Sequence, residues 1–276
     1  MRLVPKLNLC PSVAGDMPLG LRFNFSAELY VSEKYPPEMA LPRKRPPAIN
    51  LPTVVWVLIV TLIGIHFVLE WGGAHWQAFA VYTFAFIPAR LSFEYFPQPP
   101  GAALWSFLTY GFLHADWTHV LGNCLWLAVF SKPVQARLGN LRYLILLLLS
   151  IIAGAAATLV LHWGEPLQLV GISGGVSGLL AAAIPLMYGH HGPAPHGRLR
   201  PLMPLEILRD RRALTFSLMW MGLTALTATS QFLATDAMIP QQVVAWEAHV
   251  GGFIAGLIAF YALDRANRSE IIHTLH

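Results

Sequence analysis

The chain has 276 residues, of which 55% are hydrophobic and only 12% are charged, and its mean hydropathy is +0.54. A soluble domain carries about 25% charged residues, so this composition excludes an ordinary soluble protein and predicts a polytopic membrane protein. The net charge of +4 comes without a basic patch interleaved with aromatic residues, which argues against nucleic acid as a partner. The two cysteines, Cys10 and Cys124, predict neither a disulfide nor a metal site, because one lies in an N-terminal tail and the other in an apolar stretch.

Residues 1–50 contain no long apolar run and are rich in proline and charge, so we expect a cytoplasmic tail without ordered structure. The segment also lacks the short apolar core of a signal peptide. Met39 begins a compact basic stretch before the first apolar run and offers an alternative start to Met1. We expect residues 1–38 to be dispensable for activity, because no candidate site residue lies there.

The rest of the chain contains six apolar stretches, and a helix needs about 20 mainly apolar residues to cross the hydrocarbon core. None of the six contains lysine or arginine. They are Thr53–Trp71, Phe112–Ser131, Tyr143–Trp163, Leu167–Tyr188, Ala213–Ala234 and Val243–Leu263. The sequence therefore predicts an all-α membrane protein, with a bundle of six transmembrane helices over residues 51–265.

Lysine and arginine residues predict the orientation of these helices, because they favour the cytoplasmic side. The connections on one side hold four basic clusters: Arg43, Lys44 and Arg45; Lys132, Arg137 and Arg142; Arg198, Arg200, Arg209, Arg211 and Arg212; and Arg265 and Arg268. The connections on the other side hold only Arg90. Both termini are thus predicted to be cytoplasmic, with residues 266–276 as a C-terminal tail.

The connection from Gly72 to Gly111 is long, rich in aromatic residues and almost free of charge. Aromatic side chains favour the membrane interface, so we expect this connection to be partly embedded at the outer surface. An ordinary exoplasmic loop is the alternative interpretation.

Three of the predicted helices contain polar residues, which are costly at membrane depth and usually functional. The second contains HADWTHVLGN, with His114, His119 and Asn123; the fourth contains GISGGVSGL, with Ser173 and Ser177; the sixth contains AWEAHVGGFIAG, with Glu247 and His249. His119 and Asn123 are four residues apart and share one helix face. Counted from the outer ends of the predicted helices, Ser173, His249 and His119 lie at a similar depth of about 9 Å. A hydroxyl, two imidazoles and a carboxamide at one level suffice for acyl transfer.

Glycine spacing predicts contact between the fourth and sixth helices. Gly174 and Gly178 form one face of small residues, and Ala248, Gly252 and Gly256 form faces at the same spacing. Close packing of these faces would bring Ser173 within reach of His249. Packing alone also explains such glycines.

Each polar residue has a simpler alternative. A membrane histidine such as His249 is often structural or part of a proton relay, and a membrane serine often bonds to its own helix. A zinc site is excluded by spacing, because His114 and His119 are five apart and no HExxH motif is present. The nucleophile elbow of soluble hydrolases needs a strand before the serine, which the membrane context does not offer.

Three segments together resemble the rhomboid family of intramembrane serine proteases. They are WSFLTYGFLHADWTHVLGN from Trp105 to Asn123, GISGGVSGL from Gly171 to Leu179, and AHVGGFIAG from Ala248 to Gly256. The resemblance covers about residues 50–265 and implies the six-helix core of the bacterial type.

The resemblance implies a role for each candidate. In the family a glycine and a leucine follow five and six residues after the nucleophile, which matches Ser173 with Gly178 and Leu179 rather than Ser177. His249 is implied to be the base of a Ser–His dyad. His119 and Asn123, with the Ser173 backbone N–H, are implied to form the oxyanion site. Supporting positions are His114, Ser177, Gly171, Gly174, Gly178 and Gly252.

Two positions depart from the family pattern. The family often has Arg or Gln after the motif tryptophan, where this chain has Ser106. The sequence therefore puts in doubt a polar side-chain interaction that would hold the outer loop. Many members also have an aromatic residue four positions after the nucleophile, where this chain has Ser177, whose role stays open.

The resemblance implies an endopeptidase that cuts transmembrane protein substrates near their outer end, without metal or cofactor, in the inner membrane of a bacterium. It predicts no particular oligomeric state. Two alternatives remain: an inactive rhomboid-like protein that binds membrane clients, and a small transporter that uses its membrane histidines as a proton relay.

Overall fold

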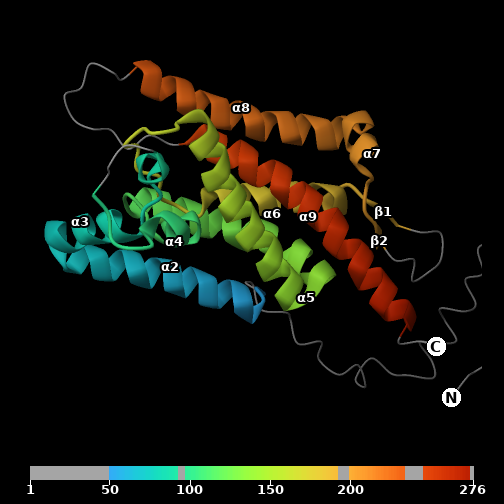
Figure 1. Ribbon diagram of the computed structural model, residues 1–276. Coiled ribbons are helices and arrows are strands. Elements are labelled where there is room, and N and C mark those ends of the chain that lie inside the picture. The colour runs from blue at the N-terminus through green and yellow to red at the C-terminus, as the bar shows by residue number, and fades with distance from the viewer. Residues whose placement is uncertain (1–49, 93–96, 192–198, 234–244, 274–276) are drawn as a thin grey trace, which may run out of the picture. The chain divides into compact units, whose positions relative to one another are not determined.

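The computed structural model describes residues 50–92, 97–191, 199–233 and 245–273 (Figure 1). Residues 1–49, including Met39, lie outside the described part, so the expected disorder and dispensability of the tail stay predictions. The elements in chain order are α2 (Thr53–Trp71), α3 (Gly73–Phe84), η2 (Pro88–Leu91), α4 (Ala102–Thr109), η3 (Tyr110–Phe112), α5 (Trp117–Leu161), α6 (Ser173–Met187), β1 (His190–His191), β2 (Leu199–Arg200), α7 (Pro204–Arg209), α8 (Arg211–Leu233) and α9 (Trp246–His273).

The described fold is almost entirely helical, as predicted. Its strands are the two-residue β1 and β2, which pair antiparallel, and an isolated bridge joins Phe86 to Leu169. Three helical stretches are long and apolar enough to cross a membrane: Thr53–Trp71, Trp117–Leu161 and Trp246–Arg265. The first of these has the predicted bounds. α9 continues to His273, so most of the residues expected to form a C-terminal tail are helical.

α5 contains most of the second predicted span, Phe112–Ser131, and nearly all of the third, Tyr143–Trp163. Its 45 residues are interrupted at Gly139, whose φ of 76° and ψ of 171° are not helical. A positive φ costs glycine little, so the chain breaks there and two helices join end to end. Each half is long enough for one span, and two crossings inside this element stay a prediction.

α6 is shorter than predicted. The expected span began at Leu167, but the helix begins at Ser173 and has 15 residues, about 22 Å at 1.5 Å per residue. The segment before it is held in a non-helical form. Leu169 exchanges two backbone hydrogen bonds with Phe86, at 2.9 and 3.1 Å, and Gly171 has a φ of 108°. Non-helical backbone is tolerated at membrane depth where protein covers it.

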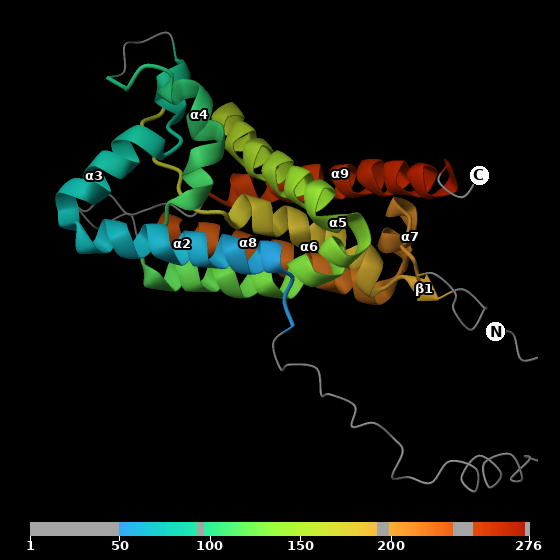
Figure 2. The same ribbon diagram turned by 90° about the horizontal axis from the view of Figure 1, so that it is seen from below.

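α6 lies in the interior of the helical bundle, between α5 and α9 (Figures 1 and 2). All its residues from Gly174 to Leu186 are buried. The contact predicted from glycine spacing is present: a Cβ on Gly252 would overlap the Gly174 carbonyl, and one on Gly256 would overlap the backbone of Gly178. On the side facing α5, a Cβ on Gly175 would come within 2.7 Å of Leu147. Small residues thus bring three helix backbones close together.

The connection from α2 to α5 is a folded unit rather than an ordinary loop. It contains α3, η2, α4 and η3, and Trp105 and Thr109 of its α4 helix donate hydrogen bonds to the carbonyls of Thr83 and Phe84, at 2.9 and 2.8 Å. Its aromatic side chains Trp76, Phe79 and Tyr82 are exposed, which suits the predicted position at the membrane interface.

Arg90 makes side-chain hydrogen bonds that hold the connection between α2 and α5, a role that Ser106 was not expected to fill. The Arg90 guanidinium is buried and donates to the carbonyls of Ala85, at 2.7 Å, and Tyr82. Ser106 is buried, and its Oγ has no partner in the described part of the chain. A basic residue elsewhere in the connection therefore holds the turn together.

The opposite end of the bundle is held by an ion pair. Arg137 of α5 donates to both carboxylate oxygens of Asp264 on α9, at 2.6 and 3.1 Å, and to the Leu199 carbonyl in β2 at 3.2 Å. A bidentate pair of this kind fixes orientation as well as distance. In Figure 2, α3 and α4 lie at one end of α2, and β1 and α7 lie at the other.

Candidate active site

The candidate residues lie at the N-terminal ends of three helices. Ser173 is the first residue of α6, His119 is the third of α5 and His249 is the fourth of α9. The prediction that this helix begins near Leu167 is therefore wrong, because Leu169 pairs with Phe86 instead of continuing the helix. First-turn N–H groups lack intrahelical acceptors and carry partial positive charge. All three helices direct that end toward the same region.

The four residues expected to carry the chemistry line one cavity of about 230 Å³. Ser173, His249, His119 and Asn123 all contribute to its wall. The remaining lining residues come mainly from α5 and α8: Thr118, Gly122, Trp126, Val176, Trp220, Leu223 and Thr224. One side of the cavity is thus polar, and the side facing α8 is largely apolar.

Gly171 lets His119 and Asn123 approach the backbone just before Ser173. A Cβ at Gly171 would lie 2.7 Å from His119 Nε2 and 3.6 Å from Asn123 Nδ2. The Gly171 N–H donates to the Tyr110 carbonyl at 3.0 Å, and its φ of 108° suits glycine alone. Asn123 Nδ2 is buried without a hydrogen-bond partner in the described segments. A buried unpaired donor beside a helix N-terminus is suited to a negatively charged group.

Comparison with known proteins finds a match to one protein family. The family model for the rhomboid domain matches residues 101–266.

The chain belongs to the rhomboid family. It is also similar to the rhomboid protease GlpG of Yersinia pseudotuberculosis serotype I (strain IP32953), with 26% identity over 169 residues. That match covers 60% of this chain and 51% of the relative, so it spans about half of the relative's length. The resemblance noted from three sequence segments is confirmed at the level of the family. α2 and α3 precede the matched region.

Ser177 differs from Ser173 in its surroundings within this rhomboid domain. Ser173 is partly exposed and lines the cavity, whereas Ser177 is fully buried and does not line it. Ser177 Oγ has no hydrogen-bond partner among the described residues. Ser177 therefore bonds neither to His249 nor to a carbonyl of its own helix.

Glu247 is a site neighbour to which sequence reasoning gave no role. It lies in the first turn of α9, two residues before His249, and is 2% exposed. Its Oε1 is 3.3 Å from His162 Nε2, and His162 Nδ1 is 2.7 Å from Glu165. These contacts tie the start of α9 to the end of α5. An acidic residue in the first turn of an apolar helix was the available signal.

His114 packs against His119 with a ring-centroid distance of 5.1 Å and an interplanar angle of 75°. His66 on α2 was also missed, because it is a single histidine in an apolar helix outside the three motifs. Its ring packs against the ring of Trp117, the first residue of α5, with 4.7 Å between the ring centroids and an interplanar angle of 88°. His119 thus has the His114 ring packed against it, and His66 lies against the first residue of the helix that carries His119.

No group of three or more histidine, cysteine, aspartate or glutamate side chains in the described ranges has the arrangement of a metal site. The polar residues around the cavity instead offer a hydroxyl, imidazoles and an amide.

Proposed function

We propose that this rhomboid protein is an intramembrane serine endopeptidase that cleaves transmembrane substrates by a Ser173–His249 dyad. The observation that carries the proposal is the shared cavity, into which Ser173, His249, His119 and Asn123 all face. Such a set supplies a nucleophile, a general base and oxyanion donors.

The first half of the reaction forms an acyl-enzyme. His249 accepts the proton of Ser173 Oγ, and the oxygen attacks the carbonyl carbon of the scissile peptide. The negative charge that develops on the carbonyl oxygen is stabilised by His119, by the Asn123 amide and by the Ser173 N–H. That N–H has no acceptor within its own helix, because Ser173 is the first residue of α6. The C–N bond then breaks, and His249 returns the proton to the leaving amine.

The second half releases the product. Water gives a proton to His249 and attacks the ester carbon, and the same donors hold the oxyanion. The bond from carbon to Ser173 Oγ breaks, and the serine oxygen regains its proton from His249. No other reactant is needed.

The apolar side of the cavity supports a membrane-embedded substrate. Trp126 of α5 and Trp220 and Leu223 of α8 line the cavity together with the polar group. A largely apolar wall suits a segment unwound from a transmembrane helix better than a charged peptide. We further propose six spans, with the cavity near the outer surface and both termini in the cytoplasm of a bacterium.

Purified protein tests the proposal in detergent or nanodiscs. We expect the wild-type chain to cut a reporter with one transmembrane helix and to react with a fluorophosphonate, and Ser173→Ala and His249→Ala to lose both activities. Wild-type protein that binds the reporter but neither cuts it nor labels would instead indicate an inactive client-binding rhomboid. A proton flux that survives Ser173→Ala would favour the transporter.

A further inference from the structure

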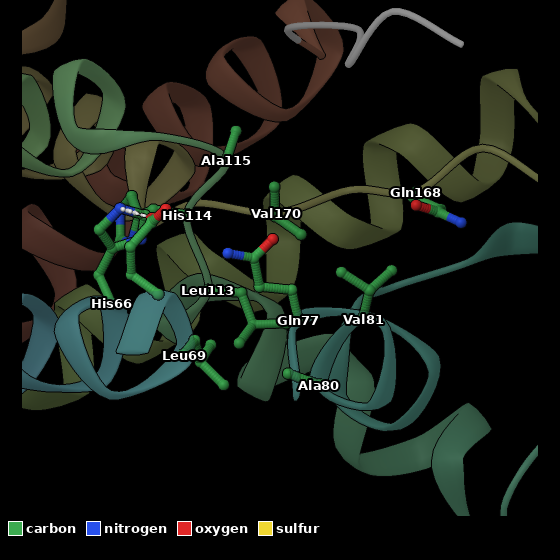
Figure 3. A pocket seen from close by; sticks show the side chains of 11 residues that line it. His66, Leu69, Gln77, Ala80, Val81, Leu113, His114, Ala115, Gln168 and Val170 are labelled. Carbon is green, nitrogen blue, oxygen red and sulfur yellow. Dashed lines mark ion pairs between the residues drawn. The ribbon is translucent and has the colours of Figure 1, made fainter. Parts of the chain in front are cut away.

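A second, smaller chamber lies behind the candidate active site. It has a volume of about 70 Å³ and is bounded by α2, α3, the segment before α5 and the segment before α6. Its polar lining residues are His66, Glu70, Gln77, His114 and Gln168. Figure 3 shows His66 and His114 close to each other on one side, with Gln77 reaching toward them from α3.

Buried ring nitrogens at this chamber lack partners. His66 is 4% exposed and His114 is 8% exposed. His66 Nε2 and both ring nitrogens of His114 are buried, and none of them makes a well-aligned hydrogen bond to a described residue, although the Phe112 backbone lies close to the His114 ring. Buried polar groups in proteins nearly always have a partner, either protein or ordered water.

The contact of His66 Nε2 with Glu70 is too long for a hydrogen bond. Glu70 Oε2 lies 3.6 Å away, one turn along α2, as the dashed line in Figure 3 marks. A polar contact of this length commonly has a water beside or between its groups. The chamber has room, since one water needs roughly 10–15 Å³ of such volume. It is too small for a lipid chain, and the described residues show no metal-binding group there.

The chamber connects to the candidate active site through ring contacts. The His114 ring packs on His119, which lines the larger cavity. The His66 ring supports Trp117, which begins the helix that carries His119. His66 therefore contacts the start of α5 directly and faces the same chamber as His114.

We propose that this chamber holds ordered water that links His66 to His114, and that His66 is thereby a positioning residue for His119. Water bonded to both histidines restrains the His114 ring, which in turn restrains the His119 ring packed on it. The consequence for activity rests on the proposed protease function, but the presence of the water does not.

Hydroxyl-radical footprinting in ¹⁸O-labelled water tests the chamber without any activity assay. Bound water directs oxidation to side chains that are otherwise protected. Leu113 lines the chamber and is 6% exposed, whereas Leu138 is 3% exposed and lies far along α5. We expect Leu113 to be oxidised at least severalfold faster than Leu138, and His66→Phe to reduce that excess. Equal protection of the two leucines in wild-type protein would overturn the proposal.

Two substitutions separate positioning from packing. His66→Phe keeps an aromatic ring against Trp117 but removes the nitrogens, whereas His66→Gln keeps a polar group. We expect His66→Phe to lower kcat about tenfold with little change in KM, less than the loss of a direct oxyanion donor. His66→Gln should stay within about threefold of wild type, and His75→Leu, at an exposed position on α3, should have no effect.

The outcomes are distinct. Unchanged kcat in His66→Phe, or an equal loss in His66→Gln, would overturn the positioning role. A melting temperature that falls with kcat in both variants would assign His66 to packing. If wild-type protein cleaves no substrate, the proposed function fails. The footprinting experiment then still shows whether the chamber holds ordered water.

Discussion

Two serines four residues apart in one glycine-rich motif lie in different environments. Ser173 begins α6 and faces the cavity, and Ser177 is fully buried one turn further along the helix. A nucleophile must reach its substrate, so exposure to the cavity favours Ser173. Within the described ranges, the Ser177 hydroxyl makes no hydrogen bond through which it could orient His249.

Labelling of two alanine variants side by side tests this distinction. We expect Ser173→Ala to lose both fluorophosphonate labelling and cleavage. Ser177→Ala should keep labelling and cut within about threefold of wild type, because it removes a hydroxyl with no recorded hydrogen bond, a change that is nearly neutral. Labelling that persists in Ser173→Ala and vanishes in Ser177→Ala would show that Ser177, and not Ser173, is the nucleophile.

The oxyanion role predicts a second difference among neighbouring residues. Removal of one oxyanion donor costs about 10²- to 10³-fold in turnover. We therefore expect His119→Ala and Asn123→Ala each to lower kcat by that order while the protein still inserts and folds. His114→Ala, which removes a buried ring from behind His119, should lower the melting temperature, and it should lower kcat by less than either of these variants because His114 supports His119 and does not itself donate to the oxyanion. Kinetic assays and thermal melts on the three variants test the oxyanion role of His119 and Asn123. Unchanged turnover in both His119→Ala and Asn123→Ala would contradict that role.

At the scale of elements, the site depends on how closely α6 and α9 approach. Gly252 lies against the Gly174 carbonyl, and Gly256 lies against Gly178. These contacts are with backbone, which cannot move aside as a flexible side chain can. The spacing of small residues therefore sets the distance between the helix that begins at Ser173 and the helix that carries His249.

One added methyl group at this contact should destabilise the fold. We expect Gly252→Ala to cost about 1–3 kcal/mol, as overpacking in a filled interior does. The matched control is Gly64→Ala in α2, where nothing lies within 4 Å of the new Cβ. The control should be neutral or stabilising by up to about 1 kcal/mol, because alanine favours helix over glycine. Unfolding in mixed micelles measures both; a Gly252→Ala variant as stable as the control would show that α6 and α9 are not in such close contact.

At the scale of the whole molecule, chemistry and basic charge lie at opposite ends of the helices. The cavity gathers the N-terminal ends of α5, α6 and α9. The Arg137–Asp264 pair and the basic residues of α7 and α8 lie toward the other end, near β2. Because basic residues favour the cytoplasmic side, this arrangement supports an outward-facing cavity.

Cysteine accessibility in whole cells tests that orientation. In a variant without Cys10 and Cys124, we expect His75→Cys on α3 to react with an impermeant maleimide added outside. Arg209→Cys at the end of α7 should react only after the membrane is opened. Both positions are exposed, so burial does not confound the comparison. The reverse pattern of labelling would contradict an outward-facing site.

The sequence by itself determined the membrane class, the family and the residue types of the candidate site. Apolar length is a local property of the chain, so the bounds of α2 were predictable. Small residues at a spacing of four predicted the contact of α6 with α9, because helix geometry alone places them on one face. The three motifs around His119, Ser173 and His249 could be recognised from the sequence, because each is a contiguous stretch of the chain.

Only the tertiary structure decided where α6 begins and what surrounds the site. Leu169 forms backbone hydrogen bonds with Phe86, more than 80 residues earlier in the chain. Because of that pairing, α6 begins only at Ser173. The contacts of Glu247 with His162 and of His66 with Trp117 likewise join residues far apart in the chain. Apolar periodicity carries no information about such pairings, because the free energy of each depends on a partner that the fold alone brings near.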